Sequence, residues 1–210
     1  NWGWQDGKKR NANVSNDHKP LFILTHYFKP DERTEWNTSA LYTFGRDGYT
    51  ALNWYDAPDP RPDYYRYLPS YNEDQYPAIA AEMANAWRND PNTSQINWDQ
   101  LYFANGKNLY TVQQAEGIQG NNITGMRSKY LVEDRRADPT RIAVNSVWSR
   151  DMGDQLKLTA GASYNNQKTH YFKVVEDLLG GDYWLDLDQF AARDSNDPNA
   201  AQNDLNTPNH

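Results

Sequence analysis

Two segments of the chain alternate apolar and polar residues almost without exception, and this period of two constrains the fold more than any other feature. On the apolar side of the first segment lie Trp36, Thr38, Ala40, Tyr42 and Phe44. On the apolar side of the second lie Leu156, Leu158, Ala160, Ala162 and Tyr164. Alternation of this kind is typical of a β-strand with one apolar face and one polar face.

The length and chemistry of these segments favour strands that cross a membrane. Each has about ten residues, the length that a tilted transmembrane β-strand needs. The polar sides consist mainly of small or hydrogen-bonding residues, namely Asn37, Ser39, Thr43, Lys157, Thr159, Ser163 and Asn165. On periodicity alone, a strand of a soluble β-sandwich explains the pattern equally well, and that alternative stays open.

Each alternating segment is expected to belong to a β-hairpin. Residues 21–29 are apolar, β-branched or aromatic, and the turn signal at 30–33 joins them to the first segment. This strand extends toward Trp54. Residues 140–150 precede a turn at 151–154 and the second segment, which continues to about Phe172. Residues 1–19 and 194–210 are polar and are predicted to be loops.

The connection between the hairpins is long and differs in character. It begins with a proline-rich, tyrosine-rich stretch, and Pro58, Pro60 and Pro62 exclude a central strand there. Apolar residues at helical spacing within 72–89 predict a short amphipathic helix that ends at Asp90-Pro91. Residues 92–128 show no sustained period. Soluble domains seldom contain such a connection, whereas outer-membrane barrels have short periplasmic turns and long outer loops.

We therefore predict an all-β fold of antiparallel transmembrane β-barrel strands in two hairpins, at about 20–55 and 129–175. A long extracellular loop at about 56–128 contains the short helix, and 176–210 forms a loop and tail. Trp36 and Trp148 lie near the short turns, and Phe44, Tyr49, Tyr164 and Tyr171 lie toward the other end. This arrangement predicts two aromatic belts.

Composition excludes several classes of function. The net charge of −7 argues against nucleic acid as a partner. The absence of cysteine excludes disulfides, thiolate catalysis and cysteine-ligated zinc. The four histidines, His18, His26, His170 and His210, have no metal-ligand spacing. We predict no catalytic residue, no metal and no cofactor.

The densest cluster of aromatic and basic residues predicts a ligand site. Tyrosine faces and guanidinium donors suit a sugar, a peptide or a capped iron chelate. The predicted binding residues are Trp54, Arg61, Tyr64, Tyr65, Arg66, Tyr67 and Trp98. An aromatic girdle, or a loop packed on itself, explains the same residues without a ligand.

Three stretches of sequence are similar to a known family. They are NWGWQDGKKRN, the stretch from KPLFILTHYFKPDERTEW to YYRYLPSY, and LTAGASY followed by VVEDLLGGDYWLDLDQF. They resemble barrel segments of TonB-dependent outer-membrane receptors of the Bacteroidetes type. The resemblance implies a 22-stranded barrel that is filled by a plug and opened by an inner-membrane energy-coupling protein. It covers most of the chain outside about 74–125.

About four strands cannot close a barrel, since the smallest such barrels have eight. We therefore expect an internal piece of a larger receptor in the outer membrane of a Gram-negative bacterium. Its partners would be outer-membrane lipid, the rest of the barrel and plug, the TonB-type energy-coupling protein and, as a further candidate, a surface lipoprotein. The function implied is import of a bulky nutrient. The alternatives are a soluble extracellular β-rich glycan-binding module and a glycoside hydrolase fragment that uses two loop carboxylates.

Overall fold

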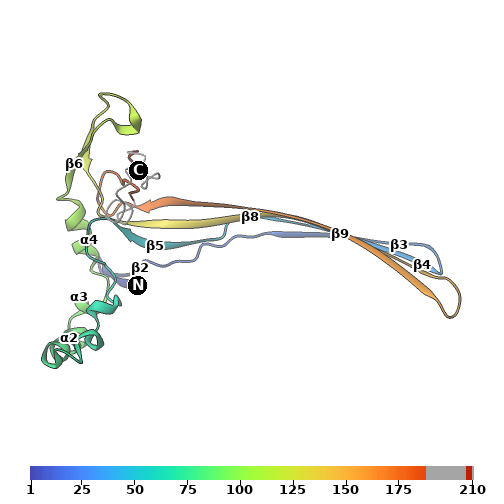
Figure 1. The fold of residues 1–210 in the computed structure, drawn as a ribbon, viewed down its shortest axis with the longest axis horizontal. Helices are drawn as coiled ribbons and strands as arrows, with labels where there is room; N and C mark the ends of the chain where they lie inside the picture. The colour runs from blue at the N-terminus through green and yellow to red at the C-terminus, as the bar shows by residue number, and fades with distance from the viewer. Residues whose placement is uncertain (188–206, 210) are drawn as a thin grey trace. The chain divides into compact units, whose positions relative to one another are not determined.

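The computed structural model describes residues 1–187 and 207–209, and its secondary structure is mostly antiparallel β-structure, as the sequence predicts. The chain divides into two compact units (Figure 1). Unit 1 comprises Asn1–Val14, Thr50–Asp134 and Val174–His210, and unit 2 comprises Ser15–Tyr49 and Arg135–Lys173. Most of the tail predicted at 194–210 lies outside the described residues.

Unit 2 is built from long strands. β3 (Leu21–Asp31) pairs antiparallel with β4 (Thr34–Phe44), from Leu21 opposite Thr43 to Asp31 opposite Thr34. β4 pairs antiparallel with the second half of β8 (Tyr130–Asp151), and β9 (Lys157–Asp177) pairs with β8. The sheet order is β3–β4–β8–β5, where β5 is Gly48–Trp54. The sheet is open among the described residues, since no strand pairs with the outer edge of β3.

The register of these strands collects the apolar residues on one face. Trp36 lies opposite Phe28 on β3 and Trp148 on β8, and Tyr42 lies opposite Phe22 and Ile142. Arg141 Nε donates to Asn165 Oδ1 at 2.8 Å, so the even-numbered residues of β9 share the face of Ile142. We call this side of the sheet the apolar face. Its apolar residues are Phe22, Leu24, Phe28, Trp36, Ala40, Tyr42, Phe44, Ile142, Val144, Trp148, Leu158, Ala160, Ala162 and Tyr164.

The apolar face is not covered by any other part of unit 2. Trp36 is 47% exposed, Leu158 48% and Tyr164 60%. The opposite face is mainly polar, although it also carries Leu21, Ile23 and Tyr27 on β3, Leu41 on β4 and Val147 on β8. We call it the polar face. The alternation predicted for 35–45 and 156–165 is therefore present as two chemically distinct faces.

Polar groups within the apolar face bond to one another. The Trp36 indole N–H donates to Ser146 Oγ at 2.7 Å, and Ser146 Oγ lies 2.9 Å from Thr38 Oγ1. Unsatisfied polar groups are costly away from water, so these contacts allow Thr38 and Ser146 to lie among apolar side chains.

Unit 1 begins with a hairpin where a loop was predicted. β1 (Trp2–Gln5) pairs with β2 (Lys8–Asn11), and Asp6 and Gly7 have φ values of 50° and 72°. Asp-Gly is the preferred pair for the tight turn that joins two strands, so a local signal for this hairpin is present in the sequence. Gly3 is required here, because a Cβ would lie 2.0 Å from the Ile96 carbonyl oxygen.

The core of unit 1 surrounds Trp98, which is fully buried. Around it pack Ala12, Leu52, Ile96, Leu101, Tyr130, Val132 and Leu179. Asn105 connects three segments beside this core. Its Nδ2 donates to the carbonyls of Tyr130, Leu178 and Leu179, and its Oδ1 accepts from the amides of Lys129 and Tyr130, all within 2.8–3.1 Å. One buried amide thus satisfies backbone groups that no sheet or helix pairs.

The connection from β5 to β8 is more ordered than its sequence indicates. It contains η1 (Tyr65–Tyr67), α1 (Pro69–Asn72), α2 (Pro77–Asn89), α3 (Pro91–Ser94) and α4 (Trp98–Asn105). β6 (Leu109–Val112), η2 (Ala115–Gly117) and β7 (Ile123–Met126) follow, with β6 and β7 paired antiparallel. The helix predicted within 72–89 is α2. No described helix has both the length and the hydropathy that a membrane span requires.

Candidate functional site

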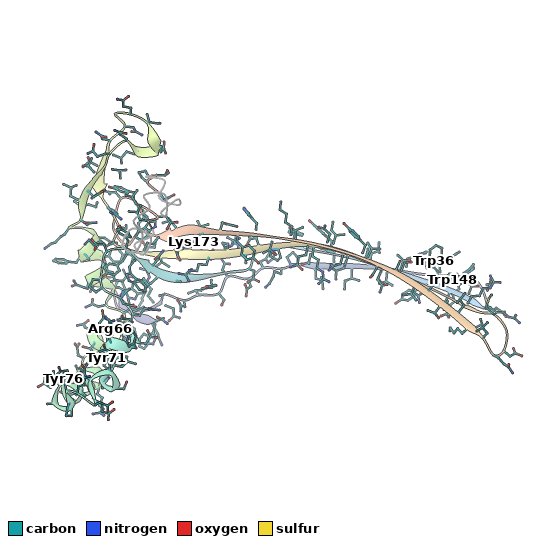
Figure 2. All side chains as sticks on the ribbon, in the orientation of Figure 1. Trp36, Arg66, Tyr71, Tyr76, Trp148 and Lys173 are labelled. Carbon is teal, nitrogen blue, oxygen red and sulfur yellow. The ribbon has the colours of Figure 1, made fainter. Side chains whose placement is uncertain are left out.

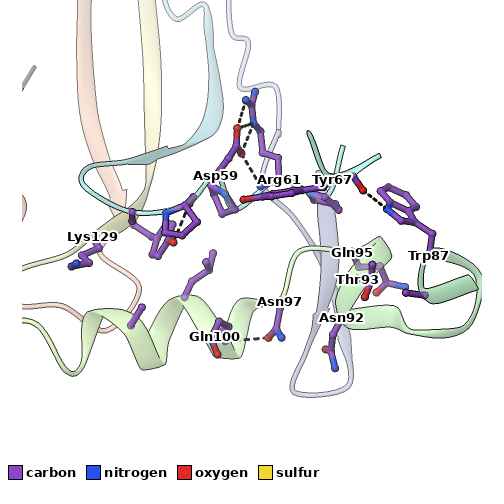
Figure 3. A pocket seen from close by; sticks show the side chains of 18 of the residues that line it. Asp59, Arg61, Tyr67, Trp87, Asn92, Thr93, Gln95, Asn97, Gln100 and Lys129 are labelled. Carbon is purple, nitrogen blue, oxygen red and sulfur yellow. Dashed lines mark hydrogen bonds and ion pairs between the residues drawn. The ribbon is translucent and has the colours of Figure 1, made fainter. Parts of the chain in front are cut away.

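A cavity of about 650 Å³ lies within unit 1, between the proline-rich segment and the helices that follow it (Figure 3). Its size is within the range of small-molecule sites. Residues 56–62 and Tyr67 form one side, and α2, α3 and α4 form the other. Lys129 and Tyr130, just before and at the start of β8, complete it.

Proline and helix-capping residues position these helices. Pro77 and Pro91 begin α2 and α3, where the missing amide proton costs nothing. Asp90 Oδ1 accepts from the Asn92 amide at 2.9 Å and caps α3. Asn97 Oδ1 accepts from the Gln100 amide at 3.1 Å and caps α4 (Figure 3). These caps provide hydrogen-bond partners for backbone amides in the first turns of α3 and α4. They thereby fix where each helix begins beside the cavity.

Arg61 and Asp59 form a closed ion pair at one side of the cavity. Arg61 Nη2 lies 2.6 Å from Asp59 Oδ2, and Nε lies 2.9 Å from Oδ1. The hydrogen bond to Asp59 raises the pKa of Arg61. The guanidinium carbon also lies 5.0 Å from the centre of the Trp54 ring. These hydrogen bonds hold the two side chains in one arrangement, and the opposite charges of Arg61 and Asp59 largely neutralise each other.

Tyr130 lines the cavity and is buried. Its hydroxyl donates to the Pro58 carbonyl oxygen at 3.0 Å, and Lys129 Nζ donates to the Asp56 carbonyl oxygen at 3.3 Å. Burial raises the pKa of Tyr130 to about 12, because the phenolate would lose its hydration. Tyr130 is thus a neutral hydrogen-bond donor that holds the proline-rich segment against β8.

The predicted aromatic cluster is real, but it packs mainly on itself. The ring centres of Tyr64 and Tyr65 are 4.8 Å apart, those of Tyr64 and Tyr67 are 5.2 Å apart, and Arg66 Nε donates to the Tyr65 hydroxyl at 2.9 Å. Figure 2 shows Arg66 and Tyr71 near one another at this cluster. Of the predicted residues, Arg61 and Tyr67 line the cavity, whereas Tyr64, Tyr65 and Arg66 do not.

The two tryptophans of the prediction do not line the cavity. Trp54 packs partly buried against the core of unit 1 and beneath Arg61. Trp98 was predicted to bind a ligand, and this is corrected: its side chain is 0% exposed, and Arg10 covers its ring at 4.2 Å. A ligand cannot reach it in this structure. Trp98 is a core residue.

Most of the cavity residues were not predicted, and they come from the proline-rich segment, from the helices and their flanking residues, and from the start of β8. Trp87 lines the cavity from α2, and its indole N–H donates to the Tyr67 carbonyl oxygen at 3.2 Å. In the proline-rich segment the unpredicted residues are Asp56, Ala57, Pro58, Asp59, Pro60 and Pro62, and the others are Met83, Ala86, Asn92, Thr93, Gln95, Asn97, Gln100, Leu101, Ala104, Lys129 and Tyr130. Residues 92–104 show no sustained period that would mark them, so their proximity to Arg61 depends on the fold. Among the described residues, no cluster of three metal-ligating side chains is present.

No protein-family model and no curated protein matches the chain. Among solved structures, it is similar to a chain described as "Cryo-EM structure of the Gasdermin A3 membrane pore", with 11% identity and a TM-score of 0.23. The similarity covers 78% of this chain and 58% of the other, so the match spans less than two thirds of that chain's length. At this TM-score, the similarity extends to neither fold nor function.

Proposed function

We propose that this chain is part of a TonB-dependent outer-membrane receptor that imports a bulky nutrient by energy-coupled transport. The observation that carries the proposal is the apolar face of unit 2. It extends over β3, β4, β8 and β9, is exposed, and is backed by a mainly polar face. A soluble domain buries such a face against a second layer. Transmembrane barrel strands instead turn it toward lipid.

The limits of the apolar face agree with the thickness of a membrane. Trp36 and Trp148 mark the end near the turns, and Phe44 marks the other. From Trp36 to Phe44 the strand has nine residues, which is within the length that a tilted transmembrane β-strand needs. Beyond the residue opposite Phe44, β8 carries Arg136 and Asp138, which form an ion pair at 2.5 Å. Charged residues next to an aromatic end are typical of a membrane–water interface.

The open edges of the sheet support a place within a larger barrel. Backbone groups in lipid must be paired, so β3 and β9 would pair with further strands of the receptor. In the proposed orientation, the short turns at 32–33 and 152–156 face the periplasm. Residues 56–128 and the cavity would then face the outside, where the nutrient arrives.

A second candidate function is a soluble extracellular β-rich glycan-binding module. Unit 1 favours it, because this unit has its own packed core around Trp98 and a cavity of about 650 Å³. The two functions differ in what covers the apolar face, which is lipid in the first and a second layer of protein in the other.

Fractionation of cells that express the complete gene tests the proposed function. The protein should remain in the outer-membrane fraction after carbonate and urea washes, and nutrient uptake should cease when the energy-coupling protein is deleted. Release of the protein by these washes would favour the soluble module. Outer-membrane retention with uptake that persists after the deletion would contradict energy-coupled transport.

A further inference from the structure

The charges that line the cavity cancel, which makes it a poor site for an ion. Its charged residues are two acids, Asp56 and Asp59, and two bases, Arg61 and Lys129. Asp59 and Arg61 are bonded to each other, and Lys129 bonds to a backbone carbonyl. A charged ligand would have to break these bonds, or would lose its hydration without gaining a charged partner. Both cost free energy, so the electrostatics favour a neutral ligand.

The helical side of the cavity carries side-chain amide groups that are available to hydrogen-bond a ligand. Within the described part of the chain, the side-chain amides of Asn92, Gln95 and Gln100 have no partner. Asn97 accepts through Oδ1 as a helix cap, which leaves its NH₂ group for a ligand. Each primary amide can both donate and accept. Figure 3 shows Asn92, Gln95, Asn97 and Gln100 along one side of the cavity.

Apolar surface lies close to these amides. Tyr67, Trp87 and Met83 contribute aromatic and thioether groups, and Leu101 and Ala104 contribute aliphatic ones from α4. Trp87 is held in place through its indole hydrogen bond to the Tyr67 carbonyl. The cavity thus combines neutral two-way hydrogen-bonding groups with fixed apolar walls.

We propose that this cavity binds a neutral saccharide. A sugar ring has apolar C–H faces that pack on aromatic and aliphatic walls, and a rim of hydroxyls that donate and accept at once. The free amides match the hydroxyls without introducing charge. If the proposed function is correct, the saccharide is the nutrient that is transported, and this part of the inference rests on the proposed function. Binding of the saccharide depends on the cavity alone.

The test is calorimetric titration of the complete protein with a panel of probes. The panel contains neutral gluco-, manno- and xylo-oligosaccharides, acidic uronic-acid oligosaccharides, a mixture of tri- to pentapeptides, and ferric hydroxamate chelates. We expect binding to at least one neutral oligosaccharide. Its affinity should change less than about twofold between about 0.05 and 0.5 M NaCl, because no ionic attraction contributes.

Variants locate the binding in the cavity. The double substitution Gln95→Ala/Gln100→Ala should weaken saccharide binding roughly tenfold or more, because buried hydroxyls of the sugar would lose their partners. Gln119→Ala, an exposed glutamine outside the cavity, should bind like the parent. Near-ultraviolet circular dichroism of each variant checks that the fold is retained. Trp87→Phe keeps the apolar wall and should retain most of the affinity.

Three results would overturn the proposal: binding of peptides, chelates or acidic sugars but of no neutral saccharide, no binding of any probe, or full saccharide affinity in a folded double variant. These results are independent of membrane location. A protein that binds saccharides but is released from membranes by the washes would retain the saccharide site and lose the receptor function. The opposite combination would retain the receptor and exclude a neutral saccharide as its nutrient.

Discussion

Trp36 and Trp148 lie directly opposite each other on β4 and β8, and both project from the apolar face of unit 2 (Figure 2). The Trp36 indole also donates to Ser146 Oγ at 2.7 Å, which fixes its orientation. Tryptophans with an apolar body and one satisfied N–H are typical of the membrane interface. Their position predicts how the protein responds to lipid.

Brominated lipids should quench the fluorescence of these two tryptophans in the reconstituted protein. Quenching should fall strongly in the double variant Trp36→Phe/Trp148→Phe, because the proposed function puts both side chains near the lipid. Trp98→Phe is the matched control, since Trp98 is buried in the core of unit 1 and is shielded from lipid. Equal quenching in the two variants would place the apolar face away from the bilayer.

Substitution of Ala40 by arginine tests the depth of the apolar face. Ala40 lies midway between Trp36 and Phe44, opposite Leu24 and Val144. Arg at the midplane should reduce the free energy of folding into the membrane by about 2–4 kcal/mol. Asn145→Arg is the control. Asn145 follows Val144, the residue opposite Ala40, and lies on the polar face, so the substitution should cost less than about 1 kcal/mol. Urea titration in vesicles measures both, and similar costs would contradict the assignment of the two faces.

Trypsin added to intact cells should cleave the long connection and spare the turns. Arg88 and Lys107 are exposed in unit 1 and belong to the segment proposed to face outward. Arg33 and Arg150 adjoin the turns of unit 2, which would face the periplasm. Peptide mass mapping identifies the sites, and permeabilised cells provide the control in which Arg33 becomes accessible. Cleavage at Arg33 in intact cells would reverse the orientation.

The parts of the fold that the sequence predicted are those determined by local pattern. Residues 35–45 alternate along one strand, so the faces of Trp36 and Ala40 could be assigned without a partner. α2 is marked by Pro77, helical spacing and a stop at Asp90-Pro91. β3 shows the limit of this approach. It is apolar on both sides, and only its pairing with β4 places Phe22 and Phe28 on the apolar face.

The candidate site could be predicted only in part, because it joins segments that are distant in sequence. Arg61 and Tyr67 belong to a conspicuous aromatic and basic cluster. Gln95 and Gln100 lie in a stretch without periodicity, and only the packing of α4 brings them to the same cavity. Trp98 shows the reverse error, since residue type alone does not distinguish a stacking platform from a core residue.

Asn105→Ala should destabilise unit 1 by about 3 kcal/mol or more. The substitution removes five hydrogen-bond contacts and takes the Asn105 partner from the buried Tyr130 amide and from the carbonyls of Tyr130 and Leu179. Asn121→Ala is the control, because Asn121 Nδ2 makes a single bond to the Ala115 carbonyl at 3.2 Å, and its loss should cost about 0.5–1.5 kcal/mol. Denaturant unfolding followed by tryptophan fluorescence compares the two. Equal effects would show that Asn105 does not hold these segments together.

Stability should decline in alkaline solution through Tyr130. Its pKa is raised by burial from an ordinary value near 10 to about 12, so the folded state holds the phenolic proton more tightly than the unfolded state does. The contribution is therefore complete below about pH 10 and is lost as pH rises toward about 12. By about pH 11 the loss should be roughly 1–1.5 kcal/mol. Tyr130→Phe removes the titrating group and the bond to the Pro58 carbonyl, so the variant should start about 1 kcal/mol less stable and lose less on going to alkaline pH. Other tyrosines titrate in both proteins, and subtracting the variant's unfolding curve from the parent's isolates Tyr130. Parallel losses in the two proteins would mean that the Tyr130 hydroxyl is hydrated in the folded state and that the cavity beside it is open to water.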